Sequence, residues 1–225
     1  RTRRGGRVTA QPLAVTAHLA GPIALPGGPL ALDSLLAAQV AIRDGIPPAL
    51  TPEAIVPIEI PIEREPGARF HLASFSVSEV ERYEGRHLNR RFPVEEAQAL
   101  GRGRVRNYRV SAGAGKSYRI PMETQHLESD MVRWWCIGEI QPIRELLAMV
   151  GHLGKKRSTG LGRVERWVVE PCETWEGFPV LLDGRPLRPL PPDWPGLGLD
   201  VMTEVRTLTY PYWDGRGRQL VAVPG

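Results

Sequence analysis

Four glycines and four basic residues alternate in the stretch GHLGKKRSTGLGRV at 151–164, and no acidic residue interrupts them. Glycine lets a backbone approach a ligand closely and adopt positive φ, while exposed amides and hydroxyls bind phosphate oxygens. The composition of this stretch therefore suits a polyanion better than a small metabolite. Its candidate binding residues are Gly154, Lys155, Lys156, Arg157, Ser158, Thr159, Gly160, Gly162 and Arg163.

Regular secondary structure is predicted on both sides of this loop. Pro142 stands where a first helical turn would begin, and residues 164–169 have the composition of a strand. A helix therefore leads into a cationic loop and then into a sheet. An ordinary helix-to-strand connection that happens to be basic is the competing interpretation, because surface loops are often rich in glycine and lysine. The apolar residues at helical spacing are Ile143, Leu146, Leu147, Val150 and Leu153.

Positive charge is concentrated in three segments of the sequence. The 225 residues carry a formal net charge of +4. Residues 1–7 contribute +4, residues 82–119 contribute +7 and the loop at 151–164 contributes +4, so the remainder is acidic. Arginine supplies most of this charge, and its planar guanidinium pairs with phosphate and stacks on bases. The distribution favours a nucleic-acid partner; a solvated basic face is the alternative for any one segment.

The basic segment at 81–119 is expected to leave the core, because its apolar pattern fades where arginine becomes frequent. A short helix is expected within it at 94–100. Candidate contacts with a polyanion on this segment are Arg86, Arg90, Arg91, Arg102, Arg104, Arg106 and Lys116.

The letters AGAGKS at 112–117 resemble the end of a nucleotide-binding phosphate loop. That motif needs a glycine where Val110 stands and a helix after Ser117, whereas the following residues read as extended and contain a proline. We therefore expect no NTPase and interpret Lys116 as one more phosphate contact.

The remaining pattern predicts an α+β fold with a ferredoxin-like βαββαβ core. Asp33 is the expected N-cap of a helix that ends at Gly45 and turns four apolar residues toward the core, namely Leu35, Leu36, Val40 and Ile42. Strands are expected at 13–19, 55–62, 70–77, 119–123, 132–137 and 164–169. The prolines on one side of 55–62 mean that this one is an edge strand or an irregular ribbon. We expect one domain over 1–225, with the insertion at 81–119 and a Pro- and Gly-rich C-terminal wrap at 171–225 that holds a last strand at 201–208.

Two adjacent tryptophans, Trp134 and Trp135, fall in one of these predicted strands. Neighbouring strand residues point to opposite faces of a sheet, so one of them is expected in the core and the other on the opposing surface. The aromatic signature of an ordinary RNA-recognition motif is absent from the sequence.

Two stretches carry a family resemblance. LALDSLLAAQVAIRDGIPP at 30–48 and IGEIQPIRELLAMVGHLGKKRSTGLGRVERWVVEP at 137–171 resemble parts of the RAMP superfamily, the RNA-binding subunits of CRISPR effector complexes. The nearest resemblance is to the type IV subunit that holds the 5′ handle of the guide RNA. It implies a ferredoxin-like (RRM-like) core, with the glycine-rich loop before the last core strand and a thumb-like projection at the basic segment.

The resemblance also implies a function in antiviral defense. The chain would be a non-catalytic, cytoplasmic subunit that binds the guide (CRISPR) RNA, caps a filament of repeating backbone subunits and contacts a large subunit. Whether target DNA is also touched stays open. No metal or cofactor is expected, because Cys136, Cys172 and the five histidines form no spacing typical of metal ligands. No apolar run is long enough to span a bilayer, so a membrane is not an expected partner.

Two other functions stay open at this point. Some RAMP proteins cut the guide precursor without a metal, using a His or Tyr general base, and His87 within the basic segment is the candidate here. His152 is expected in the last turn of a helix, where its cation would complement the helix dipole. The other alternative is an assembly protein whose basic surface meets acidic subunits without direct RNA contact.

Overall fold

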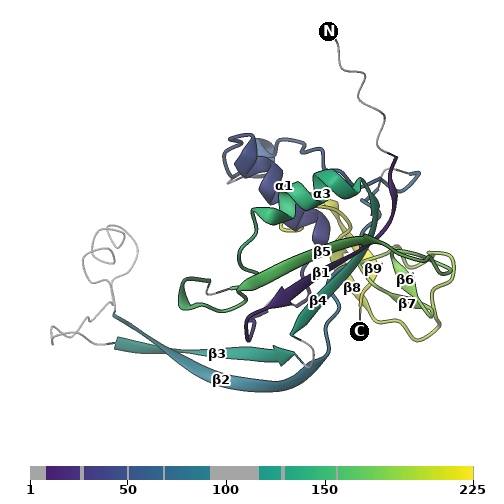
Figure 1. The fold of residues 1–225 in the computed structure, drawn as a ribbon. Helices are drawn as coiled ribbons and strands as arrows, with labels where there is room; N and C mark the ends of the chain where they lie inside the picture. Colours follow the sequence, from purple (N-terminus) through teal and green to yellow (C-terminus); the bar gives the residue numbers. More distant parts are fainter. Residues whose placement is uncertain are drawn as a thin grey trace, which may run out of the picture.

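The computed structural model describes residues 9–25, 28–49, 51–67, 69–91, 117–127, 130–155 and 157–224, with the backbone alone at 86–91 and 117–123. These residues form an α+β fold with few helices and several antiparallel sheets (Figure 1). Across the described ranges, no helix has both the length and the hydrophobicity needed to cross a membrane. The helix expected at 94–100 lies outside the described residues.

A three-stranded antiparallel sheet of order β4-β1-β5 lies at the centre of the molecule. β1 (Gln11–Leu19) pairs with β4 (Met131–Gly138) on one side and with β5 (Val164–Pro171) on the other. α1 (Leu32–Arg43) and α3 (Ile140–Ala148) cover one face of this sheet (Figure 1). The strands predicted at 13–19, 132–137 and 164–169 are confirmed. Alternate β1 residues enter the core, namely Leu13, Val15, Ala17 and Leu19.

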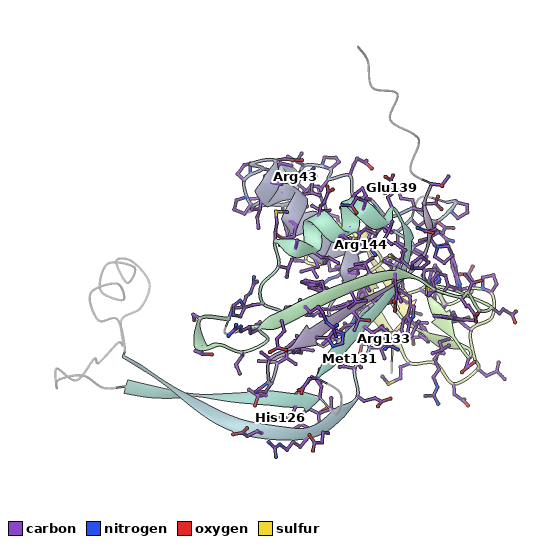
Figure 2. All side chains as sticks on the ribbon, viewed as in Figure 1. Arg43, His126, Met131, Arg133, Glu139 and Arg144 are labelled. Atoms are coloured by element: carbon purple, nitrogen blue, oxygen red, sulfur yellow. The ribbon has the colours of Figure 1, made fainter. Side chains whose placement is uncertain are left out.

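The second helix, α3, packs through its predicted apolar residues. Ile143, Leu146 and Leu147 are buried against the sheet. On another side of the helix, Arg144 donates two hydrogen bonds to the carbonyl of Val169 on β5, at 2.6 and 3.2 Å (Figure 2). These bonds fix α3, and with it the loop that follows, over the sheet.

Residues 70–77 run along the outer edge of β4 without forming a regular strand. The amides of Ser74 and Val77 donate to the carbonyls of Trp135 and Arg133, each at 2.8 Å. The order 70–77, β4, β1, β5 is compatible with a ferredoxin-like core. The strand predicted at 70–77 is therefore present only as isolated bridges.

The segment at 55–62, predicted as an edge strand or an irregular ribbon, is irregular and forms no strand. A 3-10 helix, η1 (Pro52–Ala54), precedes this segment, and a single bridge joins Ile62 to Gly138. Pro57 and Pro61 lack amide hydrogens and cannot donate to a ladder, which explains why the alternation of isoleucines does not produce a strand.

The two adjacent tryptophans of β4 lie on opposite faces of the sheet, as predicted. Trp134 is fully buried, and its indole nitrogen donates to the carbonyl of Leu30 at 2.8 Å. Trp135 is partly buried and packs edge-on against Trp175 of the C-terminal region, with ring centroids 5.4 Å apart. Both rings serve packing within the chain.

The basic segment contributes a long two-stranded antiparallel ribbon, β2 (Val80–Arg91) and β3 (Ser117–Leu127). Figure 1 shows the ribbon extending away from the central sheet. Only 119–123 was predicted as a strand here. Because β3 begins at Ser117, the residues after Lys116 are extended, which confirms that no phosphate-loop helix follows AGAGKS.

The C-terminal residues add two short hairpins. One consists of β6 (Leu181–Leu182) and β7 (Arg185–Pro186), and the other of β8 (Thr203–Thr207) and β9 (Arg218–Ala222). A 3-10 helix, η3 (Gly215–Gly217), precedes β9. β8 confirms the strand predicted at 201–208, while β9 was not predicted.

A fully buried arginine joins this C-terminal region to the body. The guanidinium of Arg188 donates to the carbonyls of His71 and Ala73 through Nη1, and to the carbonyl of Leu208 and the hydroxyl of Tyr212 through Nη2. Residues 71–73 and 208–212 are thereby held around one side chain.

Asp33 is the acidic partner of Arg188, with its Oδ2 atom 3.5 Å from Nη2. The Tyr212 hydroxyl donates to the same carboxylate at 2.8 Å, and burial raises the pKa of this phenol well above its usual value, so it stays protonated. The N-cap role predicted for Asp33 is therefore wrong: Ala31 occupies the cap position, and Asp33 serves a buried ion pair.

The apolar residues of α1 divide into two groups. Leu36 and Val40 are buried against the sheet and Leu35 is half-buried, as predicted. Ile42 is 69% exposed, so its predicted core position is wrong. It lies on a different side of the helix, toward a cavity described below.

Candidate functional site

The glycine-rich loop at 151–164 is pinned at its base by backbone hydrogen bonds. The amide of Leu153 donates to the carbonyl of Gly162 at 2.7 Å, and the amide of Val164 donates to the carbonyl of Gly151 at 2.9 Å. These bonds bring the two ends of the loop together directly after α3. The loop thus leaves and re-enters the body at one fixed place.

A second set of bonds ties the loop to residues 22–25. The amide of Lys155 donates to the carbonyl of Ala24, and the amide of Gly162 donates to the carbonyl of Pro22, each at 2.9 Å. The amide of Gly160 is engaged within the loop by the carbonyl of Arg157 at 3.0 Å. Three amides that the sequence offered for phosphate binding are therefore already bonded to carbonyls of the chain.

Two glycines of the loop are required by this close fit. Gly162 has φ +62°, and a Cβ atom there would lie 2.0 Å from the carbonyl oxygen of Leu153. Gly154 has φ +72°, and a Cβ atom there would lie 2.4 Å from the carbonyl oxygen of Ala24. Their role is to let the loop lie on the body.

The hydrophilic side chains of the loop point outward. Lys155, Arg157 and Arg163 are exposed, and so are the residues Ser158 and Thr159 of the short 3-10 helix η2 (Arg157–Thr159). Lys156 lies outside the described residues. These five predicted contacts thus give the loop an exposed, cationic and hydroxyl-bearing edge above a fixed backbone.

A cavity of about 770 Å³ lies beside this edge, between the loop, α1 and the C-terminal hairpin β8–β9. The loop contributes the stretch from Gly151 to Lys155 and also Arg157. α1 contributes one stripe of its surface, and β8 contributes its last three residues. Elements far apart in the sequence therefore enclose a single hollow.

The charge of this cavity has one sign. Lys155 and Arg157 reach it from the loop, Arg206 from β8 and Arg218 from β9, and among the described lining residues none is acidic. Glu204, outside the lining, pairs with Arg206 at 2.6 Å and offsets part of its charge. The arrangement attracts anions.

Arg206 and Arg218 were missed from the sequence. Both stand in the C-terminal part that was read as a wrap, and no local motif distinguishes them there. Arg206 lies within the strand predicted at 201–208, but no strand was predicted at Arg218, so a hairpin beside the loop was not foreseeable.

The ribbon reaches the same part of the body as the loop. The amides of Ile23 and Gln125 exchange hydrogen bonds of 3.0 and 2.8 Å with each other's carbonyls, which joins β3 to the segment that also receives the loop. The backbones of Arg86, Arg90 and Arg91 lie farther along β2. For these three arginines the structure describes the backbone alone. The other predicted contacts, Arg102, Arg104, Arg106 and Lys116, lie outside the described residues.

The histidines are dispersed among separate elements. His126 on β3 lies 2.8 Å from the carboxylate of Glu84 on β2 (Figure 2). His152 follows the end of α3 and forms a backbone bridge with Arg163, so the helix-dipole role predicted for it is wrong. The His87 side chain is not described. Within the described ranges, no three His, Cys, Asp or Glu residues are grouped to hold a metal ion.

The fold and this site define an α+β protein with a cationic surface built from a pinned glycine-rich loop, a helix and a C-terminal hairpin. The family described as CRISPR type IV associated protein Csf3 has a model that matches residues 86–224, and the chain therefore belongs to this family. The match begins within β2 and extends through the loop to the last hairpin. No curated protein matches the sequence.

Proposed function

We propose that this chain is a non-catalytic RNA-binding subunit of a type IV CRISPR effector ribonucleoprotein. The loop and the ribbon would clasp the 5′ handle of the guide RNA, and the chain would cap the filament of backbone subunits. One observation carries the proposal: a pinned, cationic loop stands beside a cavity to which four basic side chains and no acidic one contribute, in the residues described.

The electrostatics of this site support a polyanionic ligand. Exposed arginine and lysine side chains bind phosphate wherever the backbone of the ligand presents it, and they provide affinity without reading sequence. The fixed backbone of the loop adds preorganisation, because few degrees of freedom remain to be lost when the ligand binds. A single-stranded RNA offers both phosphates and unstacked bases to such a surface.

The β2–β3 ribbon corresponds in this proposal to the thumb-like projection of a RAMP subunit. In the sequence, the ribbon leaves the core between residues 70–77 and β4. Where it meets the body, its strand β3 bonds to the segment 22–25, to which the glycine-rich loop is also bonded. In the proposed assembly, loop and projection approach the RNA from two sides. The RAMP-like ferredoxin topology, the cap position and the contact with a large subunit belong to this proposal.

Binding of guide RNA across a salt series tests the electrostatic clasp. For five or six phosphate contacts on a single strand, the slope of log K against log salt is expected to be about −4. A double variant, Lys155→Ala with Arg157→Ala, should make the slope smaller by about 1.4. A slope near zero for the unmodified chain would end the proposal.

A matched control removes two positive charges elsewhere. Arg43→Ala with Arg185→Ala changes the net charge equally, and both residues are exposed and outside the cavity lining. The control should keep the slope of the unmodified chain. Equal losses in both double variants would mean that overall charge, rather than the loop, governs binding.

Cleavage is the remaining functional question. Incubation with precursor RNA in EDTA is expected to leave the RNA intact. A discrete product that disappears in His87→Ala would instead identify a metal-independent endoribonuclease. Formation of the complex without any RNA would favour an assembly protein.

A further inference from the structure

The cavity beside the loop has apolar lining residues as well as a rim of exposed basic side chains. On α1 it is lined by Ser34, Leu35, Ala38, Gln39 and Ile42, which recur at helical spacing and so form one stripe of the helix. The adjacent stripe of α1 packs on the sheet. Because Ser34 and Ala38 are small, this side of the helix leaves open space where larger residues would fill it.

Three exposed apolar side chains surround the same space. Ile42 of α1 is 69% exposed, Met149 after α3 is 47% exposed and Val205 of β8 is 63% exposed, and all three line the cavity. They come from three separate elements. Their convergence on one hollow is the pattern expected of a binding site for a partly apolar group.

Aromatic rings form another part of the lining. Phe75 and Tyr212 both contribute to it, and their rings meet edge to face with centroids 5.4 Å apart. Tyr212 is held by its hydrogen bond to Asp33, so this part of the cavity is rigidly positioned. A volume of about 770 Å³ lies within the range of ~300–1,000 Å³ common for small-molecule sites.

We propose that this cavity receives one unstacked nucleobase of the bound RNA. The base would lie among the apolar side chains, and its flanking phosphates would meet Arg157 on the loop side and Arg218 on the hairpin side. A nucleotide combines a flat apolar face with an adjacent anion, which is the combination that the lining and the rim present. This inference rests on the proposed RNA-binding function and adds to it a site that reads a base.

The C-terminal hairpin β8–β9 acquires a specific role in this arrangement. It supplies the wall opposite the loop, with Val205 facing the base and two arginines at the rim. Without the hairpin the loop and α1 would form an open surface. With it, the site distinguishes a nucleotide whose base is present from a bare sugar-phosphate chain.

The experiment uses the full chain and the repeat RNA of its host, synthesised with an abasic site at one handle position at a time. The unmodified protein should lose about tenfold in affinity at one position and little at its neighbours, as expected for one stacked base. Ser34→Phe fills the cavity without changing charge. The Ser34→Phe variant should bind every RNA of the series with the same affinity, equal to that of the unmodified protein for the RNA abasic at the preferred position. The slope of its log K against log salt should be unchanged.

Three further variants serve as controls and as a safeguard. Ala41→Phe adds the same kind of bulk to α1 but outside the cavity lining, and it should retain the positional preference. Val205→Asn removes an apolar wall residue from an exposed position, so it should fold and should also lose the preference. Val56→Asn changes a similarly exposed valine outside the lining and should not.

The outcomes separate the two proposals. If Ser34→Phe and Val205→Asn keep the positional preference, or if Ala41→Phe and Val56→Asn lose it, the base-binding cavity is refuted while RNA binding stands. If the unmodified protein binds all abasic RNAs equally but with a steep salt slope, the cavity is again refuted alone. If it shows no salt-dependent RNA binding at all, the proposed function falls, and the cavity with it.

Discussion

The glycine-rich loop and the β2–β3 ribbon are two projections of the same body that are stabilised in different ways. The loop lies on the body: its backbone is bonded to residues 22–25, and two of its glycines fit against carbonyl oxygens. The ribbon is held along its length by pairing of its own strands and joins the body at the Ile23–Gln125 bridge.

This difference indicates how the two projections respond to perturbation. The loop and the cavity depend on the packing of the body, so damage to the body should reach them. The ribbon depends on cross-strand pairs, so it should open locally while the body stays folded. A rigid element next to a locally adjustable one gives the proposed clasp a fixed half and a half that adapts.

Arg188→Met should have the largest effect on the body. It removes the buried partner of Asp33 and the donors to three backbone carbonyls, and breaking such a pair costs about 3–5 kcal/mol. Urea unfolding measures the loss in the free energy of unfolding. Arg185→Met, an exposed position three residues away, should change it by less than about 0.5 kcal/mol. A loss below about 1 kcal/mol for Arg188→Met would contradict the assigned role of the network.

Gly162→Ala should destabilise more than Gly160→Ala, which tests whether the loop is pinned. Both residues have positive φ, so both alanines incur a backbone strain of about 1 kcal/mol. Only at position 162 would the new methyl group meet a backbone carbonyl, and the total there should reach about 3 kcal/mol. Thermal unfolding of the two variants measures the difference. Equal effects would mean that the loop can lift from the body without cost.

Thr124→Val should have the smallest effect and should act on the ribbon alone. The Thr124 hydroxyl donates to the carbonyl of Glu84 at 3.1 Å across the ribbon, a bond worth about 1 kcal/mol. Hydrogen exchange of β2 amides should accelerate about fivefold, with exchange in β1 unchanged. Thr207→Val removes a similar bond to the carbonyl of Asp214 and should leave the ribbon as it was. Faster exchange in β1 as well would show that ribbon and body unfold together.

The sequence predicted the elements whose pattern is local and regular. Alternation in β1 and helical spacing in α3 follow directly from which side chains meet the core, and both predictions are confirmed. The loop was predicted from its composition together with the helix and the strand that flank it. What composition could not reveal is that its glycines serve close packing against the carbonyls of Ala24 and Leu153, because that depends on how the loop folds onto the body.

Predictions failed where tertiary contacts override local preference. Asp33 has the residue type and position of an N-cap, yet a buried arginine from the distant C-terminal region takes its carboxylate. Ile42 fits the apolar pattern of α1, yet it lines a cavity. The cavity itself was not predictable, since its third wall comes from a hairpin of which only one strand was foreseen.

The Asp33–Tyr212 hydrogen bond joins residues 179 positions apart. A ribosome releases the amino-terminal partner first, so the nascent chain carries Asp33 without the arginine and the phenol that later enclose it. The hollow between helix and hairpin is consequently absent from a nascent chain that ends before the hairpin β8–β9. If RNA binds there as proposed, it can do so only after translation has passed this hairpin.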